Sequence, residues 1–197
     1  MEDEDVQEIL FDFMNKVIIW LDAIASTKAK YYDMVKVENY DFLIEEWTPY
    51  PILSLKAKEL TATYEKHFDT YIEYVFYYQF SSFKLTYKEI TAITANFNKC
   101  ECLSSDPKYT RQYFTKLMST IFESNKGYLL ILKRIIKHFA KSKRLMGKAW
   151  KKLMLFVKSI HSNFQIISTK SYTTEIKPWE EFEKKLQSPE LSKMLAN

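Results

Sequence analysis

The chain has 197 residues, with 29 Lys and Arg against 25 Asp and Glu and only two Gly and five Pro. So few turn residues exclude an all-β fold and the glycine-rich phosphate loops of α/β nucleotide binders. With 47% apolar and 16% aromatic residues the chain is able to bury a large core, so we predict an ordered all-α protein.

The first predicted helical segment runs from 5 to 47, where apolar residues recur at the three-to-four-residue spacing of one helix face. Ser26-Thr27 marks either a kink in one helix or a break between two. Pro49 and Pro51 end the segment, because proline moves the preceding residue out of the α region. The apolar positions are Val6, Leu10, Phe13, Val17, Trp20, Ile24, Tyr31 and Met34.

A second helical segment is predicted over 53–98, with the same apolar spacing. Residues 71–78 include four tyrosines together with Ile72, Val75 and Phe76 and have high strand propensity, but the length of the segment and its lack of turn residues favour a helix. Ser81-Ser82 is a plausible bend, and 98–106 is the clearest loop. The repeating positions are Leu60, Tyr64, Phe68, Tyr71, Val75 and Tyr78.

The third segment has the most regular repeat. Asp106-Pro107 has the form of a helix start, with Asp as N-cap and proline at the first helical position. Alternate steps of four and three from Phe114 to Ile167 give sixteen positions. Only three of these are polar, namely Asn125, Ser142 and Asn163. We therefore predict one helix over 107–167, roughly 90 Å long at about 1.5 Å per residue.

Pro178 begins a short tail whose first turn carries Glu180 and Glu181, and Ser188-Pro189 repeats the cap-then-proline signal. The predicted fold is an elongated antiparallel bundle of three long, coiled-coil-like helices with a short C-terminal helical tail. We expect one bundle domain over 1–177 and the tail over 178–197.

The positive charge of the chain is concentrated in one place. Residues 124–174 contain twelve Lys and Arg and no acid, which leaves 17 basic and 25 acidic residues, a net −8, in the remainder. Seven of these cations repeat at helical spacing opposite the apolar seam, and their mutual repulsion calls for an offsetting acidic surface within the chain or an external phosphate surface. A solvated face is the ordinary alternative. This predicted ridge contains Arg134, Lys137, Lys141, Arg144, Lys148, Lys151 and Lys158.

No motif in the chain carries catalysis. Its three histidines are scattered, and Cys100-x-Cys102 alone is a weak signal for metal. Residues 143–158, with Trp150, resemble a basic amphipathic calmodulin-target pattern, although their place inside the repeat favours core packing for Trp150. We expect no enzyme activity, no cofactor, no metal and no small-molecule substrate.

In architecture alone, three long helices with a one-sided basic ridge resemble the BAR-type membrane-binding coiled coils. The leading hypothesis is a binding or scaffold protein that engages an anionic membrane or an acidic protein. Alternatives are unspecific nucleic-acid binding, with only three arginines available to read bases, and pure self-assembly. The acidic N-terminus and the charges that interrupt every apolar run predict a cytoplasmic protein, peripheral to a membrane in the first case.

Self-association is also predicted, because the third segment has more apolar residues than two partner helices cover. We expect a homodimer or an obligate protein partner. The additional apolar residues beside the third seam are Leu130, Ile131, Ile136, Leu145, Leu155 and Val157.

Overall fold

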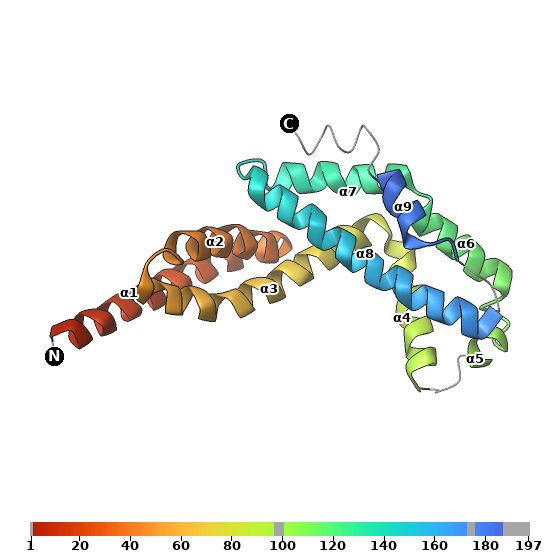
Figure 1. Cartoon of the computed structure of the whole chain (residues 1–197), viewed down its shortest axis with the longest axis horizontal. Helices are drawn as coiled ribbons and strands as arrows, with labels where there is room; N and C mark the ends of the chain where they lie inside the picture. Colours follow the sequence, from red (N-terminus) through yellow and green to blue (C-terminus); the bar gives the residue numbers. More distant parts are fainter. Residues whose placement is uncertain (1, 97–100, 173–175, 187–197) are drawn as a thin grey trace. The chain divides into compact units, whose positions relative to one another are not determined.

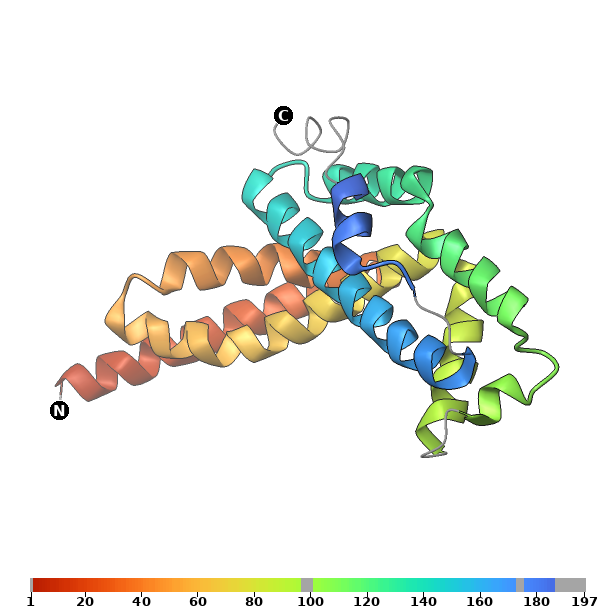
Figure 2. The same cartoon turned by 45° about the vertical axis from the view of Figure 1, so that its right-hand side comes forward.

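The protein is described by a computed structural model that covers residues 2–96, 101–172 and 176–186 (Figures 1 and 2). Every regular element among these residues is helical, which confirms the predicted all-α class. The chain forms two compact units, divided between Ile72 and Glu73. We call them unit 1 and unit 2 and describe each separately; the prediction of one domain over 1–177 stays a prediction.

Unit 1 contains α1 (Glu2–Ser26), the 3₁₀ turn η1 (Ala29–Tyr31), α2 (Tyr32–Trp47) and the part of α3 (Pro51–Gln79) that ends at Ile72. Ser26-Thr27 is a break between two helices. The Ser26 hydroxyl donates to the Asp22 carbonyl at 2.8 Å, and the Thr27 hydroxyl donates to the Ile24 carbonyl at 2.7 Å. These side-chain bonds add to the backbone bonds at the end of α1, where the Thr27 N–H also donates to the Ile24 carbonyl at 3.1 Å. The stop predicted at Pro49 and Pro51 is confirmed.

Polar side chains form a partly buried group between α1 and α2 of unit 1. Lys36 is only 6% exposed, and its Nζ lies 3.1 Å from Oδ1 of Asp22, which also accepts the Tyr40 hydroxyl. Burial alone lowers the pKa of Lys36, but hydrogen bonds to Tyr32 and Asp22 outweigh it, so the pKa is raised and the ammonium stays charged. The carboxylate of Asp22 thus connects α1 to α2 through a buried cation.

Two further carboxylates tie α2 to α3 within unit 1. The Tyr64 hydroxyl donates to Oδ1 of Asp41 at 3.1 Å, and Nδ1 of His67 lies 2.7 Å from Oδ1 of Asp33. The ring of His67 also meets the edge of Tyr32, with centroids 5.6 Å apart. Polar pairs therefore set the register of the three helices beside an apolar core, whose buried members include Met14, Val37, Leu43, Leu60 and Phe68.

Unit 2 begins with the last turns of α3 and continues into α4 (Ser81–Asn96), so the bend predicted at Ser81-Ser82 is confirmed as a break. Aromatic residues on both sides of that break pack together. Phe76 lies 5.1 Å from Phe80 and 6.1 Å from Phe83, measured between ring centroids. Such tilted and edge-to-face pairs stabilise a core by about 0.5–1.5 kcal/mol each beyond their area burial.

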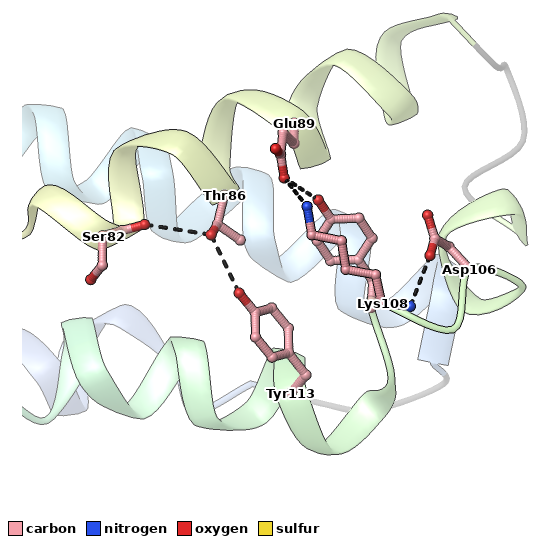
Figure 3. Close-up of polar contacts among 7 residues, drawn as sticks. Ser82, Thr86, Glu89, Asp106, Lys108 and Tyr113 are labelled. Atoms are coloured by element: carbon pink, nitrogen blue, oxygen red, sulfur yellow. Dashed lines mark hydrogen bonds and ion pairs between the residues drawn. The ribbon is translucent and has the colours of Figure 1, made fainter.

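The predicted helix start at Asp106-Pro107 is wrong. A short helix, α5 (Glu101–Ser104), precedes it inside the region predicted to be a loop, of which residues 98–100 lie outside the described part. Oδ1 of Asp106 accepts the backbone N–H of Lys108 at 2.8 Å, which closes a turn instead of capping a helix (Figure 3). The next helix, α6 (Arg111–Phe122), is capped by Thr110, whose hydroxyl accepts from the Tyr113 N–H.

Glu89 on α4 fixes this turn from the other side (Figure 3). Its Oε2 accepts from Nζ of Lys108 at 2.6 Å and from the Tyr109 hydroxyl at 2.5 Å. The hydrogen bonds from Lys108 and Tyr109 lower the pKa of Glu89. Glu89 thus holds the side chains of Lys108 and Tyr109, the two residues that follow Pro107 in the turn, beside α4.

The predicted single helix over 107–167 is also wrong, and the three-long-helix antiparallel bundle is not confirmed. This run forms α6, α7 (Asn125–His138) and α8 (Lys143–Tyr172), and α8 turns back from the end of α7 (Figures 1 and 2). Serine caps cause both breaks. The Ser124 hydroxyl accepts from the Gly127 N–H at 3.2 Å, and the Ser142 hydroxyl accepts from the Leu145 N–H at 3.1 Å. The architectural likeness to BAR-type coiled coils, which required one long third helix, loses its basis.

The C-terminal tail forms α9 (Trp179–Leu186), as predicted, with Glu180 and Glu181 in its first turn. The Phe182 ring packs 5.2 Å from that of Phe122 and 5.4 Å from that of Tyr128, so the tail belongs to the aromatic core of unit 2. The helix signal predicted at Ser188-Pro189 lies outside the described residues, as do Cys100 and the side chain of Cys102.

Charge divides between the units. Unit 1 has seven basic and fifteen acidic residues, a net −8, whereas unit 2 has 22 basic and ten acidic residues, a net +12. The predicted separation of charge along the sequence is therefore also a separation between two compact bodies.

Candidate anionic-surface binding face

The seven predicted ridge residues all belong to unit 2, but they do not form one straight ridge. Arg134 and Lys137 are on α7, Lys141 is in the turn, and the other four are on α8. The break at Ser142 therefore replaces the predicted continuous line with two helix faces joined at a turn. The exposed members are Lys137, Lys141, Arg144, Lys148, Lys151 and Lys158.

Arg134 is set apart from the others by its packing. It is half-buried, and its guanidinium carbon lies 3.5 Å from the centroid of the Tyr78 ring. A guanidinium stacked on an aromatic face at this distance makes a cation–π contact within the unit. Arg134 thus helps to hold α7 against the end of α3, and its charge is less available to an external partner.

The turn between α7 and α8 concentrates positive charge. Lys137 and His138 occupy the last turn of α7, where the helix dipole favours cations, and Lys141 follows in the connection. Lys143 and Arg144 then occupy the first turn of α8, which contains no acidic residue and where the dipole disfavours cations. An anion bound near the start of α8 relieves this unfavourable interaction.

The outward face of α8 carries the most coherent group. At about 100° per residue, Arg144, Lys148, Lys151, Leu155 and Lys158 fall within an arc of roughly 80°. From Arg144 to Lys158 the group extends roughly 21 Å along the helix. Leu155, in its centre, is 59% exposed. We call these five residues the α8 face.

The opposite side of α8 explains why this face points outward. Leu145, Ala149, Leu153, Val157 and Ile160 are buried at three-to-four-residue spacing and fill the core of unit 2. This buried stripe fixes the rotation of the helix about its axis, so the lysines on the other side remain exposed.

Two of the four cations of the α8 face have no ion-pair partner in the described part of the chain. No Asp or Glu occurs from 124 to 174, and Glu89, elsewhere in unit 2, is occupied by Lys108 and Tyr109. Within the described part of the chain, Lys137, Lys141, Lys151 and Lys158 form no ion pair. The resulting like-charge repulsion costs a few tenths of a kcal/mol per neighbouring pair on a helix.

Unit 2 also contains a cavity that the sequence does not indicate. It has a volume of about 220 Å³, opens between α6, α8 and α9, and is lined by both apolar and charged side chains. The apolar lining includes Phe114, Met118, Phe122, Ile176 and Phe182, and the charged lining is Glu123, Lys177, Glu181 and Lys185.

His161 lines this cavity and is only 2% exposed. Burial lowers the pKa of His161 despite the hydrogen bond to the Lys177 carbonyl and the nearby Glu180 carboxylate, so the ring is neutral at pH 7. Its Nε2 lies 3.0 Å from the Lys177 carbonyl oxygen and must donate to it, so Nδ1 is an acceptor, and it has no hydrogen-bond partner among the residues that the structure describes. The residues that contact His161 come from elements far apart in sequence, so the position of His161 in the sequence did not indicate this cavity.

Comparisons with protein-family models, with curated proteins and with solved structures find no match. Among the described residues, no helix has the length and apolar character required to cross a membrane. The same part of the chain contains no cluster of three or more His, Cys, Asp or Glu side chains able to hold a metal ion. The proposal that follows therefore rests on the geometry and charge of the α8 face.

Proposed function

We propose that the protein is a non-enzymatic binding protein whose unit 2 attaches peripherally to an anionic lipid surface through the α8 face. One observation carries the proposal: Leu155 is 59% exposed in the middle of four cations on one side of a long helix. Basic residues around an exposed apolar side chain suit the boundary between phosphate headgroups and acyl chains.

The chemistry of the cations favours lipid over nucleic acid. Three of the four are lysines, whose long apolar stems lie along a membrane interface while the ammonium reaches the phosphates. Base recognition relies on arginine forks, and Arg134, one of only three arginines in the chain, is packed on Tyr78. Nucleic acid and an acidic protein are therefore the alternative outcomes of the test.

The expected affinity follows from the number of charges. Each Lys or Arg near an anionic bilayer contributes about 1 kcal/mol, so four contribute about 4 kcal/mol. This is about a thousandfold preference for anionic over neutral vesicles. Burial of Leu155 in the interface adds a part of the roughly 2 kcal/mol that a leucine gains on full burial.

The decisive experiment is vesicle flotation with the triple variant Lys148→Glu, Lys151→Glu and Lys158→Glu. Binding to vesicles of phosphatidylcholine and phosphatidylserine is expected to fall at least a hundredfold, because about 3 kcal/mol of attraction is lost. Wild-type binding is expected to weaken as salt rises and to be absent on pure phosphatidylcholine.

A matched control is available in unit 1. Lys28, Lys58 and Lys66 are exposed there, and their reversal to Glu changes the net charge of the chain by the same amount. If both triple variants lose binding equally, total charge rather than the α8 face is responsible, and the proposal is wrong.

Two other outcomes also overturn the proposal. Wild-type binding to DNA or to an acidic protein without binding to anionic vesicles identifies another partner. A large loss of melting temperature in the α8 variant, with no vesicle binding by the wild type, means that acids within the chain match the cations.

A further inference from the structure

Several of the most exposed apolar side chains of unit 1 lie along one side of α1. Ile9 is 71% exposed, Trp20 62%, Phe13 61% and Val6 60%, whereas Ile19, 67% exposed, lies on another side of the helix. Isolated exposed apolar residues are common in proteins, but a strip of large ones along a single helix marks an interaction site. Val6, Phe13 and Trp20 belong to the apolar repeat of the first segment, and Ile9 lies beside it. We call the six positions of this repeat on α1 the α1 seam: Val6, Leu10, Phe13, Val17, Trp20 and Ile24.

The α1 seam lies beside the buried face of the helix. Met14 is 1% exposed and Ala25 is fully buried, and both contribute to the core of unit 1. At about 100° per residue the six seam positions occupy an arc of roughly 80° next to that core face. The apolar surface of α1 is therefore wider than unit 1 covers, and its uncovered part has the narrow form of a coiled-coil seam.

The spacing of the seam is symmetric. Its steps are four, three, four, three and four residues, which read the same in both directions around a midpoint at residue 15. A second copy laid antiparallel therefore places Val6 opposite Ile24, Leu10 opposite Trp20, and Phe13 opposite Val17. This is the self-complementarity that a two-fold symmetric interface requires.

Charge along α1 also favours an antiparallel second copy. Asp12 and Lys16 lie on one flank of the seam, on either side of its midpoint, and they pair with each other at 2.7 Å within the helix. In an antiparallel pair the same flanks of the two helices face each other, so the Asp12 of each copy lies near the Lys16 of the other. In a parallel pair these flanks lie on opposite sides of the interface, so this pairing is lost. Acidic residues predominate in the first half of α1, and Lys28 and Lys30 follow its C-terminal end. Antiparallel packing therefore places the acidic N-terminal halves of the two helices at opposite ends of the pair, away from each other.

The same acids disfavour a lipid occupant for this surface. Unit 1 has a net charge of −8, which anionic headgroups repel. We infer that the chain forms a homodimer in which the α1 seams of two copies pack antiparallel about a two-fold axis near residue 15. This inference is independent of lipid binding by unit 2.

The test is sedimentation of the full chain between about 1 and 100 μM, a range in which a seam of six apolar positions is expected to dimerise. The double variant Phe13→Glu and Trp20→Glu is expected to be monomeric and to retain wild-type helicity, because both side chains are exposed in the monomer. Phe42→Glu is the matched control, since Phe42 is 60% exposed on α2, outside the seam, and its variant is expected to remain dimeric.

The direction of pairing is tested by cysteine cross-linking in a Cys100→Ser, Cys102→Ser background. A mixture of Val6→Cys and Ile24→Cys copies is expected to form a mixed disulfide. Val6→Cys alone is expected not to cross-link, because residues 6 of the two copies are then roughly 27 Å apart along the axis. A wild-type monomer at the highest concentration overturns the inference. Efficient Val6–Val6 cross-links overturn the antiparallel arrangement, and a dimer that survives the double variant shows that another surface is used.

Discussion

The two units of this chain distribute polar and apolar residues in opposite ways. Unit 1 buries a lysine against Asp22 and exposes a phenylalanine and a tryptophan on α1. Unit 2 buries aromatic rings such as Phe76, Phe83 and Phe164 and exposes lysines along α8. Both follow the same helical periodicity, so periodicity alone does not tell which kind of partner a helical surface takes. The kind of partner is indicated by the side chains that each unit exposes. These are apolar side chains with acidic neighbours in unit 1, and lysines and arginine in unit 2.

The largest effect on stability is expected from breaking the buried polar group of unit 1. Asp22→Ala leaves the Lys36 ammonium, 6% exposed, without its carboxylate partner, and removes the acceptor of the Tyr40 hydroxyl. A buried charge without its partner costs about 3 kcal/mol, somewhat less here because Asp22 itself is partly exposed. Urea unfolding followed by circular dichroism measures the loss.

The companion variant Lys36→Met distinguishes the contribution of the buried ammonium charge to stability from that of side-chain packing. It removes the buried ammonium together with its need for a partner, so it is expected to cost less than Asp22→Ala. Equal losses from both variants contradict the view that unit 1 is held by a buried ion pair.

A smaller effect is expected at a close contact in unit 2. A Cβ at Gly127 lies 2.7 Å from Cζ of Phe80 and 2.8 Å from the Ser124 hydroxyl, so Gly127→Ala forces the aromatic core apart. Such overpacking costs about 2 kcal/mol and outweighs the gain in helix propensity.

Gly147 on α8 is the matched position, because a Cβ there meets nothing within 4 Å. Gly147→Ala is therefore expected to stabilise the protein by up to about 1 kcal/mol. Thermal unfolding of the two alanine variants distinguishes them by the sign of the change in melting temperature. The same sign for both contradicts the tight packing described for Gly127.

The smallest effect is a pH dependence that belongs to unit 2. Burial lowers the pKa of His161 in the folded protein below its ordinary value of 6.5. The unfolded chain therefore binds the proton first as pH falls, so His161 contributes stability above pH 6.5 that is lost as pH falls through its folded pKa. In His161→Gln the melting temperature is expected to depend less on pH between pH 7.5 and 5 than in the wild type. If the slope of melting temperature against pH is unchanged, His161 is not the cause of the pH dependence.

The all-α class and the ends of several helices were predictable from the sequence, because they depend on interactions between residues close together in the chain. Ser26-Thr27, Pro49 and Ser81 mark breaks through hydroxyl and proline effects that act within a few residues. The breaks in the third segment had a signal as well. Asn125 and Ser142, two of its three polar seam positions, lie at the two helix starts, yet the unbroken apolar register outweighed them in the prediction.

Other features depend on contacts between distant residues and had no local signal. Asp106 closes a turn because Glu89, seventeen residues away, holds the neighbouring Lys108 and Tyr109. The positions of the basic residues on α8 were predictable from spacing, but the exposure of Leu155 among them was not. It follows from the buried stripe on the other side of the helix, which only the packed unit defines.

The central claim is that the two units use different surfaces for different partners. Hydrogen exchange of the full chain, with and without vesicles containing phosphatidylserine, tests it most directly. We expect vesicles to slow exchange over 144–158 on α8 and to leave exchange over 6–24 on α1 unchanged. Protection of α1 by the vesicles, or none on α8, would contradict this assignment.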